Sequence, residues 1–187
     1  GLAKAGFQPH NSITSKPAAA VAQRSSEALP QNLSNILWAM VALCWDPDAS
    51  TVSKLATAAA QRSSEANPQN LSNTLWALPQ LGWYDARQIP VLVAALAQHV
   101  SSPANIAQDF SNALQALGDL RWYDAGLYSQ LVQGVVHKIS SNAPDAAGQE
   151  FSNTLFSCAL SCHFDSSVDV LAEWGSQQSL HHWGEQA

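Results

Sequence analysis

The sequence has few charged residues and very few basic ones. Charged side chains make up 12% of the 187 residues, about half of the usual share in globular domains. Eight Lys plus Arg stand against fourteen Asp plus Glu, which gives a net charge of −6 at pH 7. This balance excludes a strongly basic protein that binds nucleic acid mainly by neutralising phosphates. It remains compatible with a protein that stacks on bases and contacts them through amides.

Cysteines and long apolar runs are also scarce. Cys44, Cys158 and Cys162 are too few for a disulfide framework, so we expect a reducing compartment. The longest apolar run covers about nine residues, Ile89–Ala97, which is too short to span a bilayer. Residues 1–10 contain no apolar segment of the kind that a signal peptide needs. Hydrophobic residues make up 47% of the chain, which argues against disorder over its whole length.

The motifs of the common catalytic sites are missing. The sequence contains no GxGxxG, P-loop, GxSxG or HExxH motif. Cys158, Cys162 and His163, with His181 and His182 further on, supply only half of a usual zinc pattern. We therefore expect no enzyme activity, no metal site and no cofactor.

The chain repeats itself about every 38 residues. Four segments align without gaps, and each begins at a Gln: Gln31, Gln69, Gln108 and Gln149. Four residues later comes an Asn, here called the shared Asn: Asn35, Asn73, Asn112 and Asn153. Residues 20–40 match residues 58–78 at 17 of 21 positions, which indicates a recent duplication.

Each repeat has the pattern of a helix pair. Apolar residues of the second repeat are spaced by 4, 3 and 3 positions, at Leu71, Leu75, Leu78 and Leu81. This stripe predicts an amphipathic helix, with Asn67 and Pro68 at its start and Gly82 at its end. Asp85 is then expected to cap a second helix over about residues 86–100. Nothing alternates with a period of two, so we predict no strands.

Helix pairs of this length bury their apolar faces only by stacking on each other, so the predicted fold is all-α, an α-solenoid of stacked antiparallel helix pairs. The stripe should be buried between repeats, together with Leu33, Leu37, Phe110, Leu114, Phe151 and Leu155. We expect residues 1–29 to be the C-terminal part of a truncated repeat. Repeats 1 to 3 follow at 30–67, 68–104 and 105–144, then a divergent repeat 4 at 145–180 and a tail at 181–187.

Residues 68–83, PQNLSNTLWALPQLGW, and the 38-residue period resemble the octotricopeptide-repeat (OPR) family. The resemblance covers about residues 1–180 and is most specific in the first two repeats, because Gln115 and Phe156 replace the Trp later. The motif is also similar to the FAST-type repeats of mitochondrial RNA-binding proteins. The resemblance implies an RNA-binding solenoid of a chloroplast or mitochondrion that acts in RNA stability, processing, translation or ribosome assembly. Its implied partners are single-stranded RNA or rRNA and other ribonucleoprotein components, with no membrane.

Amides and a Trp recur on the helix side that lies away from the apolar stripe. In the first two repeats these candidates are Gln31, Asn35, Gln69, Asn73 and Trp76. Such amides could hydrogen-bond base edges while the Trp stacks on a base. Alternatively, the shared Asn forms a structural ladder that ties each helix to the next repeat. Its presence in all four repeats favours the structural interpretation, because a base code needs residues that vary.

Two positions beside the shared Asn do vary between repeats. The residue directly after it is Ile36, Thr74, Ala113 or Thr154, and the residue seven after it is Ala42, Gln80, Asp119 or Leu160. Thr74 and Gln80 are therefore our candidates for reading bases.

Basic residues recur near the ends of the second helices, at Arg24, Arg62, His99 and Lys138. A ladder of cations could contact successive phosphates. The alternative is a favourable cation near each helix C-terminus. The family resemblance favours an RNA-binding module, whereas the acidic balance favours a protein-binding scaffold within a larger complex.

Overall fold

The computed structural model describes residues 20, 23–85, 87–101, 107–141 and 148–184. Throughout these residues all regular structure is helical, with eight α-helices, two short 3-10 helices and no strand. The predicted all-α fold is confirmed, and the helix pairs stack as in a helical repeat. No helix of the described ranges is both long and apolar enough to cross a membrane.

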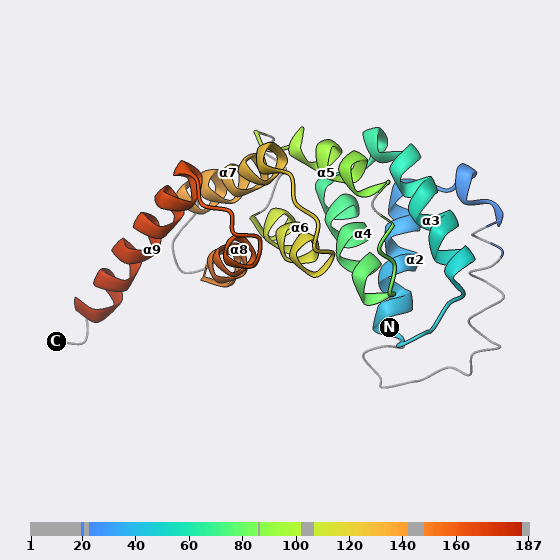
Figure 1. The fold of residues 1–187 in the computed structure, drawn as a ribbon, viewed down its shortest axis with the longest axis horizontal. Coiled ribbons are helices and arrows are strands. Elements are labelled where there is room, and N and C mark those ends of the chain that lie inside the picture. Colours follow the sequence, from blue (N-terminus) through green and yellow to red (C-terminus); the bar gives the residue numbers. More distant parts are fainter. Residues whose placement is uncertain (1–19, 21–22, 86, 102–106, 142–147, 185–187) are drawn as a thin grey trace. The chain divides into compact units, whose positions relative to one another are not determined.

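The chain divides into two compact units, residues 1–95 and 96–187. The helices that begin in the first unit are η2 (Ser25–Glu27), α2 (Pro30–Ala42), α3 (Ala49–Gln61), η3 (Ser63–Glu65), α4 (Pro68–Gln80) and α5 (Ile89–Ala97). α2 packs side by side with α4, and α3 packs against both of them (Figure 1). First helices of consecutive repeats therefore stack directly on each other.

The second unit repeats this arrangement. Its helices are α6 (Ala107–Asp119), α7 (Ala125–Ser141), α8 (Gly148–Leu160) and α9 (Ser166–Gly184). α6 packs on α8 and on α7, while α9 packs against α7 and α8 (Figure 1). α9 continues to Gly184, so residues 181–184, which we expected to be a tail, are helical. Most of the expected truncated repeat, residues 1–29, lies outside the described residues.

The apolar stripe forms the core, as predicted. Buried members, at most 1% exposed, are Leu33, Leu37, Leu71, Leu75, Leu78, Phe110 and Leu114. Three other expected core residues are only half-buried: Leu81, Phe151 and Leu155. Two of these three, Phe151 and Leu155, belong to the divergent last repeat.

The start of α4 is as predicted, but α5 is shorter than expected. Asn67 caps α4, because its Oδ1 accepts a hydrogen bond from the backbone N–H of Asn70 at 2.8 Å. α5 begins at Ile89 instead of residue 86. Asp85 Oδ1 accepts the backbone N–H of Arg87 at 3.1 Å, which holds a turn there instead of a helical start. Pro90 then suits the first turn of the helix.

All four first helices end in the same C-terminal motif. The residue nine after the shared Asn has a positive φ: +50° at Cys44, +67° at Gly82, +51° at Arg121 and +50° at Cys162. The next N–H donates to a carbonyl five residues back at 2.9–3.0 Å, in the pairs Trp45–Met40, Trp83–Leu78, Trp122–Leu117 and His163–Cys158. This is the Schellman arrangement, which places an apolar side chain against the helix end. The recurrent Trp is therefore explained by helix termination.

Candidate nucleic-acid interface

On each first helix the recurrent amides and the aromatic residue lie on one side of that helix, and these sides are here called the amide face. Its members are Gln31, Asn35 and Trp38 on α2; Gln69, Asn73 and Trp76 on α4; Gln108, Asn112 and Gln115 on α6; and Gln149, Asn153 and Phe156 on α8. Spacings of four and three residues put each set on one side of its helix. The first Gln of each set is exposed, as are Trp38 (47%) and Phe156 (59%), whereas Gln115 is half-buried.

The shared Asn is not the structural ladder that we favoured from the sequence. Within the described part of the chain, no hydrogen bond involves the side-chain amide of Asn35, Asn73, Asn112 or Asn153. The buried polar residue is instead the Ser directly before it. Ser34 is 0% exposed, its hydroxyl donates to the Gln31 carbonyl at 3.1 Å, and it accepts from Asn70 Nδ2 at 3.4 Å. The shared Asn amides thus remain available to a ligand.

Thr74 is buried, which is unfavourable for a residue that reads bases. Its side chain is 2% exposed, and its hydroxyl donates to the Asn70 carbonyl at 2.8 Å. Ala113 and Thr154 at the same position are 0% exposed. The position faces protein because a helical residue one step after the shared Asn points about 100° away from it. The placement of Thr74 therefore does not favour a contact with a base.

The other varying position is accessible. Gln80 and Asp119 are exposed, Leu160 is 55% exposed and Ala42 is half-buried. Each lies four residues after the aromatic or Gln115 position of the amide face, so it is the next side chain along the same side of the helix. Gln80 thus keeps the placement that its candidate role requires.

The basic side chains of the expected ladder mostly make ion pairs and hydrogen bonds within the protein. Arg62 is bound by Glu65 at 2.5 Å and donates through Nη1 to the Ala28 carbonyl at 3.0 Å. The hydrogen bond to Glu65 raises the pKa of Arg62, and the pKa of Glu65 is lowered in return. Arg24 pairs with Glu27 at 2.8 Å. These contacts match structural roles for both arginines more closely than phosphate contacts.

Lys138 is also poorly placed for a phosphate contact. Its residue exposure is 9%, in the last turn of α7. A buried ammonium must leave its protein surroundings before it can reach a ligand. The favourable placement of a cation near a helix C-terminus accounts for its position.

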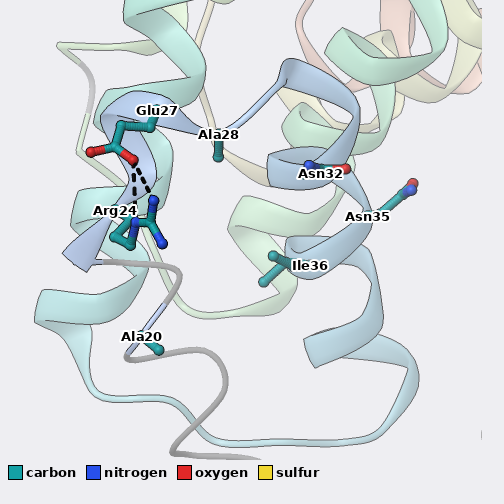
Figure 2. Close-up of a pocket in the computed structure, with 7 residues that line it drawn as sticks. All are labelled: Ala20, Arg24, Glu27, Ala28, Asn32, Asn35 and Ile36. Carbon is teal, nitrogen blue, oxygen red and sulfur yellow. Dashed lines mark hydrogen bonds and ion pairs between the residues drawn. The ribbon is translucent and has the colours of Figure 1, made fainter.

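A groove beside α2 brings two of the predicted residues together, Arg24 and Asn35. Its volume is about 570 Å3, and it is lined by Ala20, Arg24, Glu27, Ala28, Asn32, Asn35 and Ile36. Figure 2 shows the Arg24–Glu27 ion pair on one side, with Asn32, Asn35 and Ile36 on α2 across from it. Because Glu27 neutralises Arg24, the groove offers amides and apolar surface instead of net charge.

The second unit contains a polar cluster that the sequence analysis missed. Tyr123 Oη and His163 Nδ1 are 2.8 Å apart, and His163 is 3% exposed. His163 Nε2 lies 3.2 Å from Asp165 Oδ2 but makes no hydrogen bond to the groups described around it. The cluster exists because His163 occupies the position of Trp45, Trp83 and Trp122. It links the start of α7 to the turn before α9.

The pKa values of three groups in and beside this cluster are shifted. Partial burial alone would raise the pKa of Asp165, but hydrogen bonds from Ser129, Ser167 and two backbone N–H groups lower it to about 2. Burial raises the pKa of Tyr128 to about 12 and that of Cys158 to about 11. At neutral pH the carboxylate is charged, while the phenol and the thiol keep their protons. Neither is therefore an activated nucleophile.

No group of three or more His, Cys, Asp or Glu side chains is arranged for a metal ion in the part of the chain that the structure covers. The side chains of His181 and His182 lie outside the described residues.

Residues 5–129 match the family model described as the Tbc2 translation factor, N-terminal domain. The match spans more than half of the chain. The chain belongs to this family. The Tbc2 match takes in α2 to α6, and with them the amide face of the first three repeats, and it ends within α7. No curated protein matches the chain.

Proposed function

We propose that the chain is a helical-repeat RNA-binding module of an organellar factor for RNA stability, processing, translation or ribosome assembly. The family's name, a translation factor, favours translation among these processes. One observation carries the proposal: each of the four first helices has a shared Asn that is exposed or half-buried, and in the described structure none of these amides is hydrogen-bonded. Polar groups that a fold uses internally are normally hydrogen-bonded, and these amides are not.

The proposed mechanism is contact with unpaired bases. Exposed Trp38 and Phe156 and half-buried Trp76 offer flat surfaces on which bases stack. The neighbouring Asn and Gln amides carry both donors and acceptors, which suit base edges. In a duplex the bases are already stacked and paired, so single-stranded RNA is the ligand that fits. Gln80 and Asp119 differ between repeats and would discriminate between bases. The module itself would carry out no reaction.

The experiment measures binding of the full chain to single-stranded RNA selected from a random pool. Replacing Trp38 or Trp76 with Ala should weaken binding about 5- to 150-fold, since one stacked base contributes about 1–3 kcal/mol. Tyr84→Ala is the matched control, because Tyr84 is 61% exposed but lies outside the amide face. Gln80→Ala should change base preference more than affinity. Equal binding by both Trp variants and wild type would refute the assigned face.

A second candidate function is a scaffold that binds protein. It rests on the last repeat, where exposed Leu160 and Phe164 (74%) give an apolar surface beside Phe156. If no RNA is selected near physiological salt, this function takes precedence.

For the location, we propose a chloroplast or mitochondrion, which imaging of the tagged parent protein would test.

A further inference from the structure

The fourth repeat presents three large apolar side chains on its first helix and in the turn that follows. They are Phe156, Leu160 and Phe164, the residues three, seven and eleven after the shared Asn, and they are here called the apolar strip. Each of the three is more than half exposed. In every other repeat at least one of these positions is polar, namely Asp46, Gln80, Gln115 and Asp119. Contiguous exposed apolar side chains of this size mark interaction sites more often than bare surface.

The openness of these positions does not depend on a neighbouring repeat being absent. α8 packs on α6, and the residues seven and eleven after the shared Asn of α6, Asp119 and Tyr123, are nevertheless exposed. α4 packs on α2, and Trp38, three after the shared Asn of α2, is nevertheless 47% exposed. First helices therefore stack through other sides, and the positions of the apolar strip stay accessible within an array.

Contacts with the third repeat hold the apolar strip in place. A Cβ atom added to Gly118 on α6 would lie 3.4 Å from Leu160, so this part of the strip lies against α6 (Figure 1). Tyr123 Oη is 2.8 Å from Nδ1 of His163, the residue directly before the last member of the strip. Asp119, which directly follows Gly118 and is exposed, therefore borders the strip. The surface is formed before a partner binds, so little ordering opposes binding.

The two compact units differ in charge. Residues 96–187 contain nine Asp plus Glu against two Lys plus Arg, a net charge of −7, whereas residues 1–95 contain five against six, a net charge of +1. Of the two cations in the second unit, Lys138 is buried and Arg121 is exposed. The exposed carboxylates among its described residues are Asp119, Asp124, Asp169 and Glu173. A field of this sign attracts cations and repels the phosphates of a polyanion.

We propose that the apolar strip is the docking site of a protein partner, through a segment whose apolar side chains are flanked by Lys or Arg. The apolar side chains would pack on Leu160 and Phe164 and remove both from water, and such central contacts carry most of the affinity of an interface. The cations would lie near Asp119 and Asp124, in the negative field of this unit. A second copy of the chain fits less well, because neither of its units carries a substantial positive charge.

The docking site goes beyond the proposed RNA binding and does not rest on it, because the Trp side chains to be tested for RNA, Trp38 and Trp76, lie in the first unit. Phe156 and Asp119 border both the amide face and the apolar strip, so either ligand can reach them. The experiment therefore leaves these two residues unchanged and alters Leu160 and Phe164, which separates the two proposals.

The test selects binding peptides from a random library displayed on phage, against the full chain freed of nucleic acid. Selected peptides should be rich in apolar residues and in Lys or Arg. Leu160→Ser and Phe164→Ser should each weaken their binding at least about tenfold. Val170→Ser is the matched control, because Val170 is an apolar residue of the same unit that is 48% exposed but lies outside the strip. Circular dichroism establishes that each variant is folded.

Three results of this selection would overturn the proposal. The first is that no peptide is selected, and the second is that the selected peptides are acidic. The third is that the peptides bind Leu160→Ser and Phe164→Ser as tightly as wild type.

The RNA selected for the proposed function distinguishes a nucleic-acid role of the strip from a protein role. Leu160→Ser and Phe164→Ser should bind that RNA as wild type does, and Trp38→Ala should bind the peptides as wild type does. Strip variants that lose RNA affinity but keep peptide affinity would assign the strip to RNA and overturn the docking proposal. Dimers of wild type that both variants abolish, measured by sedimentation, would assign it to a second copy instead. If no RNA is selected, the RNA proposal fails, and the peptide measurements still decide this one.

Discussion

At the scale of single residues, the helix ends hold the least favourable backbone of the described chain. Four first helices need a left-handed residue to close the Schellman motif, and only Gly82 is the residue type that adopts this conformation without a side-chain penalty. Cys44, Arg121 and Cys162 adopt it with φ near +50°. An L-residue with a side chain pays about 1–2 kcal/mol there.

Glycine at these positions should therefore stabilise the protein. Arg121→Gly and Cys162→Gly remove the side-chain penalty but add backbone entropy to the unfolded chain, so we expect a net gain of about 0.5–1 kcal/mol each. Urea unfolding followed by circular dichroism measures the change. Gly82→Ala is the reverse control and should cost about 1–2 kcal/mol. A loss of stability in both glycine variants would mean that the side chains contribute more than the backbone penalty.

At the scale of helices, Phe residues of the last two repeats pack against glycines. Phe110 on α6 faces Gly134 on α7, where an added Cβ would lie 3.0 Å from the ring. Phe151 on α8 faces Gly175 on α9, and there the distance would be 2.2 Å. Phe151 also contacts the ring of Trp174, with centroids 5.5 Å apart. The larger aromatic side chain is accommodated because the second helix lacks a side chain at the contact.

This arrangement predicts a strong coupling between Phe151 and Gly175. Gly175→Ala should destabilise the chain by about 1–3 kcal/mol through overpacking, although Ala is the better helix former. With Phe151→Leu in place, the same substitution should become neutral or stabilising, since Leu33 and Leu71 occupy the Phe151 position in the first two repeats. A double-mutant cycle by thermal unfolding gives the coupling energy. Equal effects of Gly175→Ala in both backgrounds would contradict the predicted contact.

The sequence predicted the elements better than the contacts between them. The 38-residue period and the apolar stripe were sufficient for the helices, the core and the cap at Asn67. Variation between repeats selected both Gln80 and Thr74, but burial of Thr74 depends on the neighbouring repeat, which a single helical wheel does not contain. The shared Asn looked structural because it never varies. The true buried partner, Ser34, is equally invariant in its column, and only the structure distinguishes the two.

At the scale of the whole molecule, the net charge is −6. In addition, several of the basic side chains are already paired with carboxylates of the protein. Arg24 and Arg62 pair with glutamates, and Arg87 forms a close ion pair with Asp85. Among the described residues, few positive charges therefore remain for a polyanion. Whatever RNA binds must do so mostly through bases, with little release of counterions.

Binding to single-stranded RNA should accordingly depend weakly on salt. Each phosphate neutralised on a single strand contributes about −0.7 to the slope of log K against log salt concentration, so we expect a slope smaller in magnitude than about 2. Fluorescence anisotropy with a labelled RNA at several KCl concentrations measures it. Arg62→Gln should lower the free energy of unfolding more than it lowers the affinity for RNA, because Arg62 contacts Ala28 and Glu65 of the protein itself. A slope steeper than about −4 would show that phosphate contacts dominate.

The junction between α2 and α4 has a consequence for how such a gene changes in length. The Ser34 position is a Ser in all four repeats, the Asn70 position is an Asn in the first two, and residues 20–40 and 58–78 are nearly identical. A DNA duplication of one 38-residue period therefore inserts a helix pair whose two faces already match its new neighbours, and a deletion closes the gap in the same way. Selection on individual amide-face and position-seven residues can then proceed after the array has already folded. Recombination can thus lengthen or shorten the array by whole repeats.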